Sequence, residues 1–368
     1  MRIQSIEVWH IRLPMQFCFK TARGLLAERD TMVIKFVTDD GTCGYGENVA
    51  FTLPFYTKET LQGGWDVFAR HIGQALIGFE WKPRQGYAYD KWRKSFPMLC
   101  TGLDIALWDA YGKEKKQPVM SLLFPEDTLK DTIAGGLVIG QVPIPDVLSL
   151  VRKAVADGYK RIKLKVSPKD GIDRIERVRQ IYDGLLAVDA NQSYALADRQ
   201  ALAIYDRYNL VCIEEPFSDA TWTDIGHVQA QMQTPLCLDE STHSYEDVVS
   251  AYQAGGLSML NIKAGRLGGL EEAKKAIYFC RCHSISFWIG SMVESGISKW
   301  VHAHLAALGD TCMPGDLSDS ARYFKEEISQ PPLHFKKGNL ERPQGSGFGY
   351  TVDEERVEAH SLAHLIFE

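Results

Sequence analysis

The stretch RIKLKV (161–166) begins a series of short β-rich runs, each with a charged residue at or near its end. The runs that follow are LLAVDA (185–190), VCIEE (211–215), PLCLDE (235–240) and MLNIKAG (259–265). The charged residues are Lys165, Asp189, Glu214, Asp239 and Lys263, spaced 24, 25, 25 and 24 residues apart. A helical pattern fills each interval, so the series predicts repeated strand–helix units.

Three further runs extend this series to eight strands. They are TIAGGLVIG (132–140), ISFWIG (285–290) and CMPGD (312–316). Eight such units in about 185 residues match a (β/α)8 barrel. A doubly wound open sheet is the alternative, but it has fewer strands and usually a glycine-rich first turn, which residues 136–145 lack. We therefore expect an α/β fold with a modified TIM barrel.

The segments on either side of the barrel predict a second unit. Residues 1–60 alternate apolar and polar, and DDG (39–41) predicts a hairpin turn between two β-rich runs. Helical patterns follow at 59–77, 83–94 and 97–117, and the glycine-rich GSGFGY (345–350) predicts a turn-rich return to this unit. We expect an α+β capping domain over 1–125, the barrel over 126–320, and a segment over 321–368 that completes the cap.

Composition excludes several classes of partner. The 368 residues carry a net charge of -6, which gives no support to binding nucleic acid or an anionic membrane surface. No run reaches the roughly 18 apolar residues of a membrane span, and residues 1–14 do not resemble a signal peptide. The eight cysteines are scattered, without zinc-ribbon spacing, as in a reducing compartment. We expect a cytoplasmic protein without nucleic-acid or membrane partners.

Lysines mark both ends of the charged series. Lys163 and Lys165 are two residues apart in a strand, so they share one face. Like charges disfavour each other, and we expect each ammonium to lower the pKa of the other, as suits a base near neutral pH. A solvated basic edge is the alternative. Lys263 ends the sixth predicted strand, which lies across the barrel from the second.

Three carboxylates lie between these lysines in the series. Asp189, Glu214 and Asp239 end adjacent strands at equivalent heights, so they should meet at the same end of the barrel. Their mutual repulsion calls for a cation, and Mg²⁺ prefers such oxygen ligands. Separate salt bridges to loops are the alternative. Together, the lysines and carboxylates predict removal of a proton next to a carboxylate, with the resulting enediolate stabilised by a metal and a lysine.

Two other functions could use strand-end lysines. A Schiff-base aldolase would need one lysine in a desolvated pocket and would have no role for three convergent carboxylates. A non-catalytic binding barrel would have little reason to keep lysines on both sides of a metal site. EDTA sensitivity and borohydride trapping distinguish the first alternative, and the effect of Lys165→Ala tests the second.

These motifs resemble the enolase superfamily, in its muconate-lactonising-enzyme subgroup, over essentially the whole chain. The motifs are KLK (163–165), VDAN (188–191), IEEP (213–216), LDES (238–241), NIKAGRLGG (261–269) and GSMVESGIS (290–298). Within the subgroup, LPFYTKET (53–60) and MPGDLSDSARYFKEEI (313–328) are similar to the o-succinylbenzoate synthase / N-succinylamino acid racemase family.

The resemblance implies a role for each residue of the site. Lys165 would be the base on one face of the substrate, Lys263 would lie on the other, and Lys163 would support Lys165. Mg²⁺, with Mn²⁺ as an alternative ion, would bind the three carboxylates. The positions around them would be Asn191, Glu240 and Arg266. Substrate contacts would come from Tyr56, Ser291, Met292 and Glu294. The resemblance also implies a homo-oligomer.

The implied reaction is the syn-dehydration of 2-succinyl-6-hydroxy-2,4-cyclohexadiene-1-carboxylate to o-succinylbenzoate, a step of menaquinone synthesis. The alternative is racemisation of an N-succinyl or other N-acyl amino acid, with the two lysines as bases, and one enzyme could do both. The chain departs from the family at Thr21-Ala22-Arg23-Gly24, within the capping loop (19–29), and at Gly290-Ser291. Both departures lie at the expected substrate end, so they concern the substrate and leave the chemistry unchanged.

Overall fold

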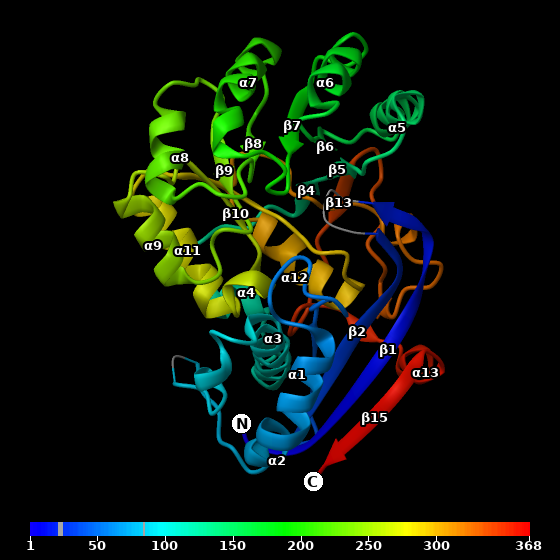
Figure 1. Ribbon diagram of the computed structural model, residues 1–368. Helices are drawn as coiled ribbons and strands as arrows, with labels where there is room; N and C mark the ends of the chain where they lie inside the picture. The colour runs from blue at the N-terminus through cyan, green and yellow to red at the C-terminus, as the bar shows by residue number, and fades with distance from the viewer. Residues whose placement is uncertain (21–24, 84) are drawn as a thin grey trace.

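The computed structural model describes residues 1–20, 25–83 and 85–368 (Figure 1). The departure from the family at 21–24 therefore lies outside the described residues. An antiparallel sheet, in the order β15-β1-β2-β3, forms the cap below the barrel in Figure 1. Its strands are β1 (Ile3–Lys20), β2 (Leu25–Thr38), β3 (Cys43–Asn48) and β15 (Ser361–Phe367). The predicted hairpin turn at 39–41 is confirmed, with Gly41 at φ +81°.

A nearly fully buried helix, α3 (Pro97–Glu114), packs on the cap sheet. Glycines on both elements make this close packing possible. A Cβ atom on Gly46 of β3 would lie 1.9 Å from the carbonyl oxygen of Gly102 in α3, which no side chain could tolerate.

The other helices of the cap are shorter than predicted. The predicted helix at 59–77 is α1 (Leu61–Val67), a π-helical turn (Phe68–Ile72) and α2 (Gly73–Leu76). The prediction of a helix at 83–94 was wrong, because the described part of that segment contains only one 3-10 turn (Asp90–Trp92). The following helix of the cap is α4 (Val119–Leu123).

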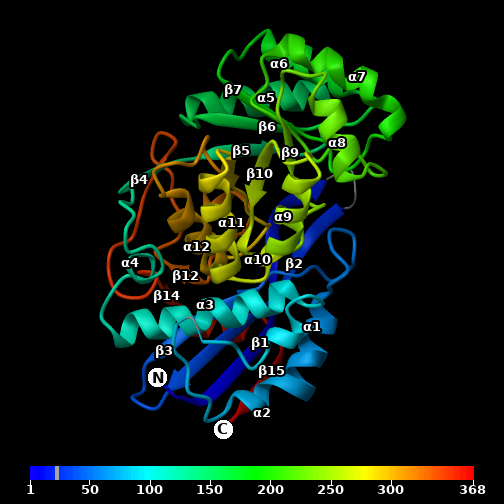
Figure 2. The ribbon, with the colours of Figure 1, turned by 90° about the vertical axis from the view of Figure 1, so that its left-hand side faces the viewer.

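Seven parallel strands form the barrel sheet, in the order β11-β10-β9-β8-β7-β6-β5. They are β5 (Gly136–Ile139), β6 (Arg161–Lys165), β7 (Leu185–Asp189), β8 (Ile213–Glu214), β9 (Leu236–Leu238), β10 (Met259–Ile262) and β11 (Ser286–Ile289). The connecting helices are α5 (Ile144–Ala156), α6 (Gly171–Arg179), α7 (Arg199–Ala203), α8 (Trp222–Gln229), α9 (Tyr245–Gln253), α10 (Ala264–Leu267), α11 (Leu270–Cys282) and α12 (Gly296–Ala306). Figure 2 shows most of these helices around the outside of the curled sheet, whereas the short α10 lies next to α3 of the cap. The modified barrel fold is confirmed.

The first and the eighth expected strands differ from the prediction. The run at 132–140 divides, and β4 (Thr132–Ala134) leaves the barrel to pair with β13 (Asn339–Glu341). The segment 312–316 is not a strand, in part because Pro314 has no N–H to donate. It still closes the sheet, since Cys312 and Asp316 donate backbone hydrogen bonds to β11 and Gly315 forms a parallel bridge with Gly135.

The C-terminal segment returns to the cap, as predicted. The segment 345–350 is rich in turns, and the Gly347 carbonyl accepts a hydrogen bond from the Val119 N–H at 2.8 Å. Further along the chain, β15 pairs with β1, with Phe367 opposite Ile6. The remaining elements are β12 (Ser329–Gln330), β14 (Thr351–Val352) and α13 (Glu354–Ala359).

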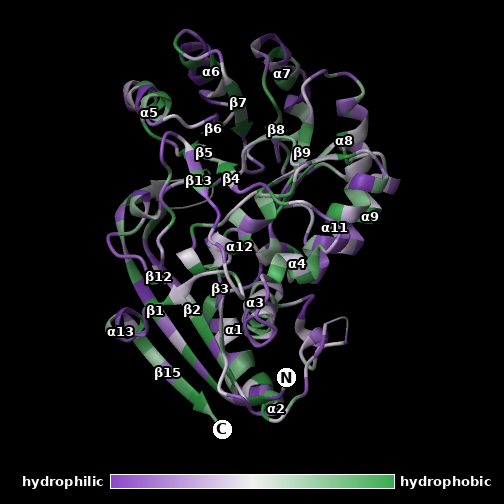
Figure 3. Cartoon of the chain, turned by 180° about the vertical axis from the view of Figure 1, so that it is seen from behind, coloured by the Kyte–Doolittle hydropathy of each residue, from purple (hydrophilic) through white to green (hydrophobic). Residues whose placement is uncertain are grey.

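The barrel helices carry hydrophilic and hydrophobic residues together, as expected for helices with one face on a sheet (Figure 3). In α5, Val147, Val151 and Ala154 are buried, whereas Arg152 and Lys153 are exposed. Within the residues that the structure describes, no helix is long and apolar enough to cross a membrane.

Candidate active site

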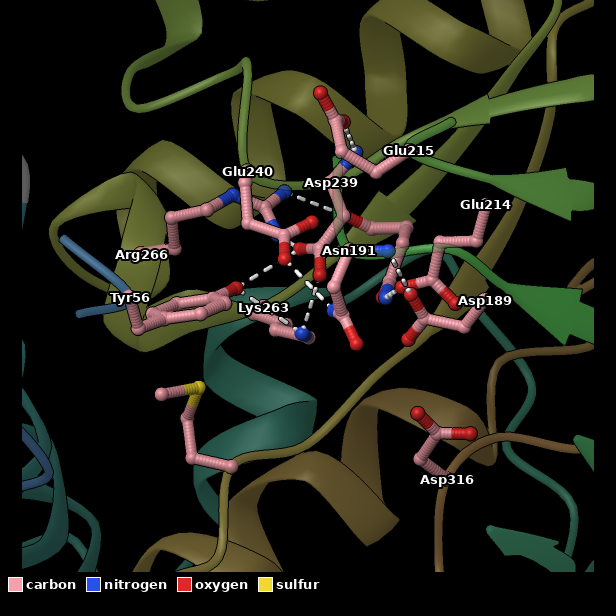
Figure 4. Close-up of polar contacts among 12 residues, drawn as sticks. Tyr56, Asp189, Asn191, Glu214, Glu215, Asp239, Glu240, Lys263, Arg266 and Asp316 are labelled. Carbon is pink, nitrogen blue, oxygen red and sulfur yellow. Dashed lines mark hydrogen bonds and ion pairs between the residues drawn. The ribbon is translucent and has the colours of Figure 1, made fainter. Parts of the chain in front are cut away.

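Charged side chains from five consecutive strands gather at one end of the barrel, and Figure 4 shows Asp189, Glu214, Asp239 and Lys263 of this group. The carboxylates of Asp189, Glu214 and Asp239 stand at the ends of β7, β8 and β9, with exposed fractions of at most 2%. Lys165 on β6 and Lys263 directly after β10 lie on either side of these three strands. The 24- and 25-residue spacing in the sequence thus corresponds to neighbouring positions in the sheet.

Each of these carboxylates is paired with a different cation. The Lys165 Nζ lies 2.6 Å from an Asp189 oxygen, and the Lys263 Nζ lies 2.7 Å from an Asp239 oxygen. Burial opposes ionisation of Asp189, but Lys165 and then Lys163 hold its pKa below the usual range. The two outer lysines therefore belong to separate ion pairs at opposite sides of the row of carboxylates.

Lys163 lies beside Lys165 on β6, but its environment differs from the expectation. Its Nζ donates to Glu214 at 2.6 Å and to Asp316 at 2.5 Å, and it lies 4.9 Å from the centre of the Trp288 ring. Burial alone would lower its pKa, but the charges of Asp316, Glu214 and Asp189 raise it. The expected lowering of the Lys163 pKa was wrong, because the surrounding carboxylates outweigh repulsion between ammonium groups.

Lys263 is held in a cluster that includes the cap residue Tyr56. The Lys263 Nζ lies 3.1 Å from the Tyr56 hydroxyl, and that hydroxyl donates to an Asp239 oxygen at 3.0 Å. Arg266 donates to the same carboxylate of Asp239 and also to the Thr242 carbonyl, at 2.6 Å. Figure 4 shows Tyr56, Lys263 and Arg266 on one side of the site. Tyr56 thus connects the cap to the end of the barrel.

Strained backbone positions hold the residues beside the carboxylates. Asn191 has φ +44°, and its side-chain amide donates to Glu240 at 2.8 Å. Glu215, with φ +40°, accepts the backbone N–H of Asp239 at 2.7 Å. Burial, followed by the charge of Asp189, raises the pKa of Glu240 to about 7. These contacts fix the directions of the strand-end carboxylates.

The four residues expected to contact substrate lie in different surroundings. Tyr56 lies at the carboxylates, as described above, and Met292 is buried in an apolar cluster with Phe51 and Met98 of the cap. The Ser291 hydroxyl donates to the Asp316 carbonyl at 2.6 Å. Glu294 is fully buried and bonds to His302 at 2.8 Å. Tyr56 and Met292 therefore belong to the wall between cap and barrel, and both oxygens of Glu294 are engaged within the chain.

Sequence reasoning missed several residues of this site, of which Asp316 is the most important. Asp316 bonds to Lys163 and, at 2.6 Å, to the buried Arg161. Asn261 donates to Glu214 at 2.7 Å. The signal for Asp316 was present, since it ends the eighth β-rich run as the other carboxylates end theirs. Asn261 is two residues before Lys263 and therefore on the same face of the strand.

The donor set fits a hard divalent cation. In the described part of the chain, no group of three His, Cys, Asp or Glu side chains is arranged to hold a metal ion, because lysine and arginine side chains pair with the carboxylates. The three carboxylates nevertheless supply only oxygen donors from adjacent strands, as Mg²⁺ prefers. One oxygen of Glu240 beside them is also buried without a hydrogen-bond partner, so one acceptor at the site is left over for a cation.

Comparisons with known proteins agree with this geometry. Residues 3–123 match the family model "Mandelate racemase / muconate lactonizing enzyme, N-terminal domain", and residues 146–356 match "Enolase C-terminal domain-like". The chain is 34% identical to an o-succinylbenzoate synthase of Listeria innocua, over 96% of this chain and 94% of that protein. It is 31% identical to an N-succinylamino acid racemase of Amycolatopsis, over 99% of each.

The fold is also found among solved structures. A member of the enolase superfamily from Enterococcus faecalis V583 superposes with a TM-score of 0.90 at 31% identity, over 100% of this chain and 99% of that one. Both the cap and the barrel are therefore shared with that protein.

Proposed function

Because this chain belongs to the mandelate racemase / muconate lactonizing enzyme family of the enolase superfamily, we propose that it is a Mg²⁺-dependent o-succinylbenzoate synthase. The observation that carries the proposal is the row of three buried carboxylates with a lysine at each side. A Schiff-base lyase has no use for this row. A binding protein has no use for a lysine on each side of it.

The proposed metal ligands are Asp189, Glu214 and Asp239. When bound, Mg²⁺ supplies positive charge to these three carboxylates and to the carboxylate of the substrate. Two neighbouring residues orient ligands directly: the Asn191 backbone N–H donates to Asp189 at 3.0 Å, and Arg266 donates to Asp239. Enzymes of the enolase superfamily use Mg²⁺, and its use by this chain is part of the proposal.

In the proposed dehydration, Lys165 in its neutral form takes the proton from the carbon next to the substrate carboxylate. The electrons of the broken C–H bond move into the enediolate. They return to form the new ring double bond as the hydroxide leaves, and the Lys165 ammonium gives its proton to that hydroxide to form water. Because one base serves both steps on one face, the elimination is syn. Lys263, on the other side, supplies positive charge near the enediolate.

Racemisation of an N-acyl amino acid is the second candidate. It has no leaving group and needs a proton donor on the face opposite the base, and a lysine from each side of the carboxylate row fits that need. The apolar cluster of Phe51, Met98 and Met292 packs against Tyr56 and so gives this side of the site an apolar wall in either reaction. We therefore propose racemisation as a second activity of the same site.

The other expectations from the sequence are part of the same proposal. The substrate is a small carboxylate, the protein is a cytoplasmic homo-oligomer, and Mn²⁺ can replace Mg²⁺. The segments 1–125 and 321–368 form the cap over a barrel at 126–320.

The test is a ¹H NMR assay in D₂O with Mg²⁺ on two substrates in parallel, the hydroxycyclohexadiene carboxylate and N-succinylphenylalanine. We expect rapid dehydration of the first substrate. Exchange of the α-proton for deuterium in the second substrate, with inversion at that carbon, would show that the protein also has the racemase activity. Lys165→Ala should abolish both reactions, whereas Lys153→Ala, on the outside of α5, should change neither. No change in either substrate, together with thermal stability that is insensitive to EDTA, would refute the proposal.

A further inference from the structure

A groove of about 530 Å³ lies between β5 and α5 and shares no lining residue with the candidate active site. One wall is α5, the second is the end of β1, and the third is the segment that contains Asp319 and Arg322. In a regular (β/α)8 barrel a helix follows the eighth strand. Here the chain after Asp316 makes only a 3-10 turn (Ser320–Arg322) before it leaves for the cap. The space beside α5 is therefore not filled by a helix.

Apolar side chains form most of the lining. Leu137 comes from β5, Val142 from the loop after it, and Leu150 from α5. Phe17 of β1 also lines the groove, and 40% of its surface is exposed. A concave site of this size with mostly apolar walls and few polar groups is typical of small-molecule binding.

Four charged residues line the groove, and three of them lie within ion-pair distance of another side chain. Lys153 and Asp157 pair at 3.0 Å on the surface. Asp319 pairs with His334 at 2.8 Å and accepts a hydrogen bond from the Tyr159 hydroxyl at 3.2 Å.

Arg322 differs from the other three. Its Nη2 donates to the Val138 carbonyl at 2.9 Å, while its Nε is buried without a hydrogen-bond partner. None of the ion pairs in the described part of the chain includes Arg322. Its guanidinium lies over the Phe17 ring, 5.7 Å from the ring centre. The groove therefore has one guanidinium that forms no ion pair with a carboxylate of the described chain, next to an exposed aromatic ring.

We propose that this groove is a second binding site, for a small carboxylate with an apolar body such as an arylalkanoate. The carboxylate binds the guanidinium of Arg322, since arginine donates charge-assisted hydrogen bonds to carboxylates. The apolar body packs between Phe17 and Leu150. No residue of the groove belongs to the candidate active site, so the proposal does not depend on the function proposed above.

The experiment uses Cys18, an exposed cysteine in the wall of the groove, as a reporter. The full-length protein, with EDTA present, is alkylated by iodoacetamide in the presence of 3-phenylpropionate, and peptides are quantified by mass spectrometry. The neutral 3-phenylpropanamide is the matched control ligand, and the exposed Cys282 of α11 is the internal control. We expect 3-phenylpropionate to slow alkylation of Cys18 at least fivefold, with no change at Cys282 and no effect of the amide.

Three variants complete the test. Arg322→Gln removes the charge, and Leu150→Trp narrows the groove without changing a charge; each should abolish the protection of Cys18. Arg152→Gln removes a neighbouring exposed charge from α5 outside the groove and should leave the protection intact. The proposal is overturned if the carboxylate gives no protection, if the amide protects equally, or if protection persists in Arg322→Gln. Should Arg322→Gln fail to fold, persistence of protection in Leu150→Trp overturns it.

Discussion

The substitution Asp316→Asn tests the ion-pair network below the strand-end carboxylates. Asp316 accepts hydrogen bonds from Lys163 at 2.5 Å and from Arg161 at 2.6 Å, and both cations are at most 1% exposed. Asparagine keeps the size of the side chain but removes its charge. Lys163 retains Glu214, whereas Arg161 loses the one carboxylate it pairs with in the described chain. The folded state then contains a buried guanidinium without a counter-charge.

The size of the effect follows from burial. Removal of one partner from a buried ion pair costs about 3–5 kcal/mol. The exposed pair of Lys153 and Asp157 provides a matched control, because such surface pairs contribute about 0–1 kcal/mol. We therefore expect Asp316→Asn to lower the free energy of unfolding by about 3–5 kcal/mol, and Asp157→Asn by less than about 1 kcal/mol.

The pH dependence gives a second check on the same carboxylate. Burial opposes ionisation of Asp316, but Lys163 and then Arg161 hold its pKa well below the usual range. Its contribution is therefore complete above the ordinary aspartate pKa of about 4 and declines as the pH falls from there toward the lower native pKa. The difference between the wild type and Asp316→Asn should narrow below pH 4.

The assay is urea unfolding followed by circular dichroism, at pH 7 and at pH 3.5, with the denaturant slope checked in each variant. If Asp316→Asn lowers the free energy of unfolding at pH 7 no more than Asp157→Asn does, the expected cost of the unpaired guanidinium is refuted. A loss that is the same at both pH values would also refute it, since the loss would then come from packing and not from charge.

Three further substitutions have clear expected outcomes. Glu59 is buried against two backbone N–H groups at the start of α3, and burial raises its pKa to about 8, so stability should fall as the pH rises from about 4.3 to about 8. Glu59→Gln should remove this fall of stability with pH, as measured by urea unfolding. If stability still falls equally in the variant, a group other than Glu59 causes the pH dependence. Tyr56→Phe removes the hydroxyl that contacts the Lys263 ammonium, and it should slow α-proton exchange of N-succinylphenylalanine about tenfold. Equal exchange rates in the variant and the wild type would contradict a role of this hydroxyl in the reaction. Gly46→Ala should cost about 3 kcal/mol or more because α3 blocks the new Cβ, whereas Gly309→Ala meets no atom within 4 Å and should have little effect in the same unfolding assay.

Local pattern predicted the parts of the fold that local forces determine. The runs ending near Lys165, Asp189 and Glu214 became strands with neighbouring ends, because their apolar residues and spacing already define strand–helix units. The run 312–316 has the same position in the sheet without forming a strand, since Pro314 cannot donate a hydrogen bond. The division of 132–140 could not be predicted, because the partner of β4 is β13, about 200 residues later.

The environment of Lys163 could not be predicted either, because it depends on a residue far away in the sequence. Its neighbour in sequence, Lys165, suggested a lowered pKa, but its closest partner is Asp316, which is 153 residues away in the chain. A pKa depends on every charge within a few ångströms, and strand alternation gives only the charges on the same strand. Arg161, at the start of the same run, joined the network for the same reason and was not expected there.

The pairing of β15 with β1 has a consequence for synthesis of the protein. About 340 residues separate the end of β1 from the start of β15. At a translation rate of about 5–20 residues per second, the partner of this edge leaves the ribosome roughly 20–70 s after β1 does. During that time one edge of β1 has open N–H and C=O groups that can pair with another nascent chain. This edge of β1 therefore stays open to a chaperone that binds extended segments until residues 361–367 have emerged.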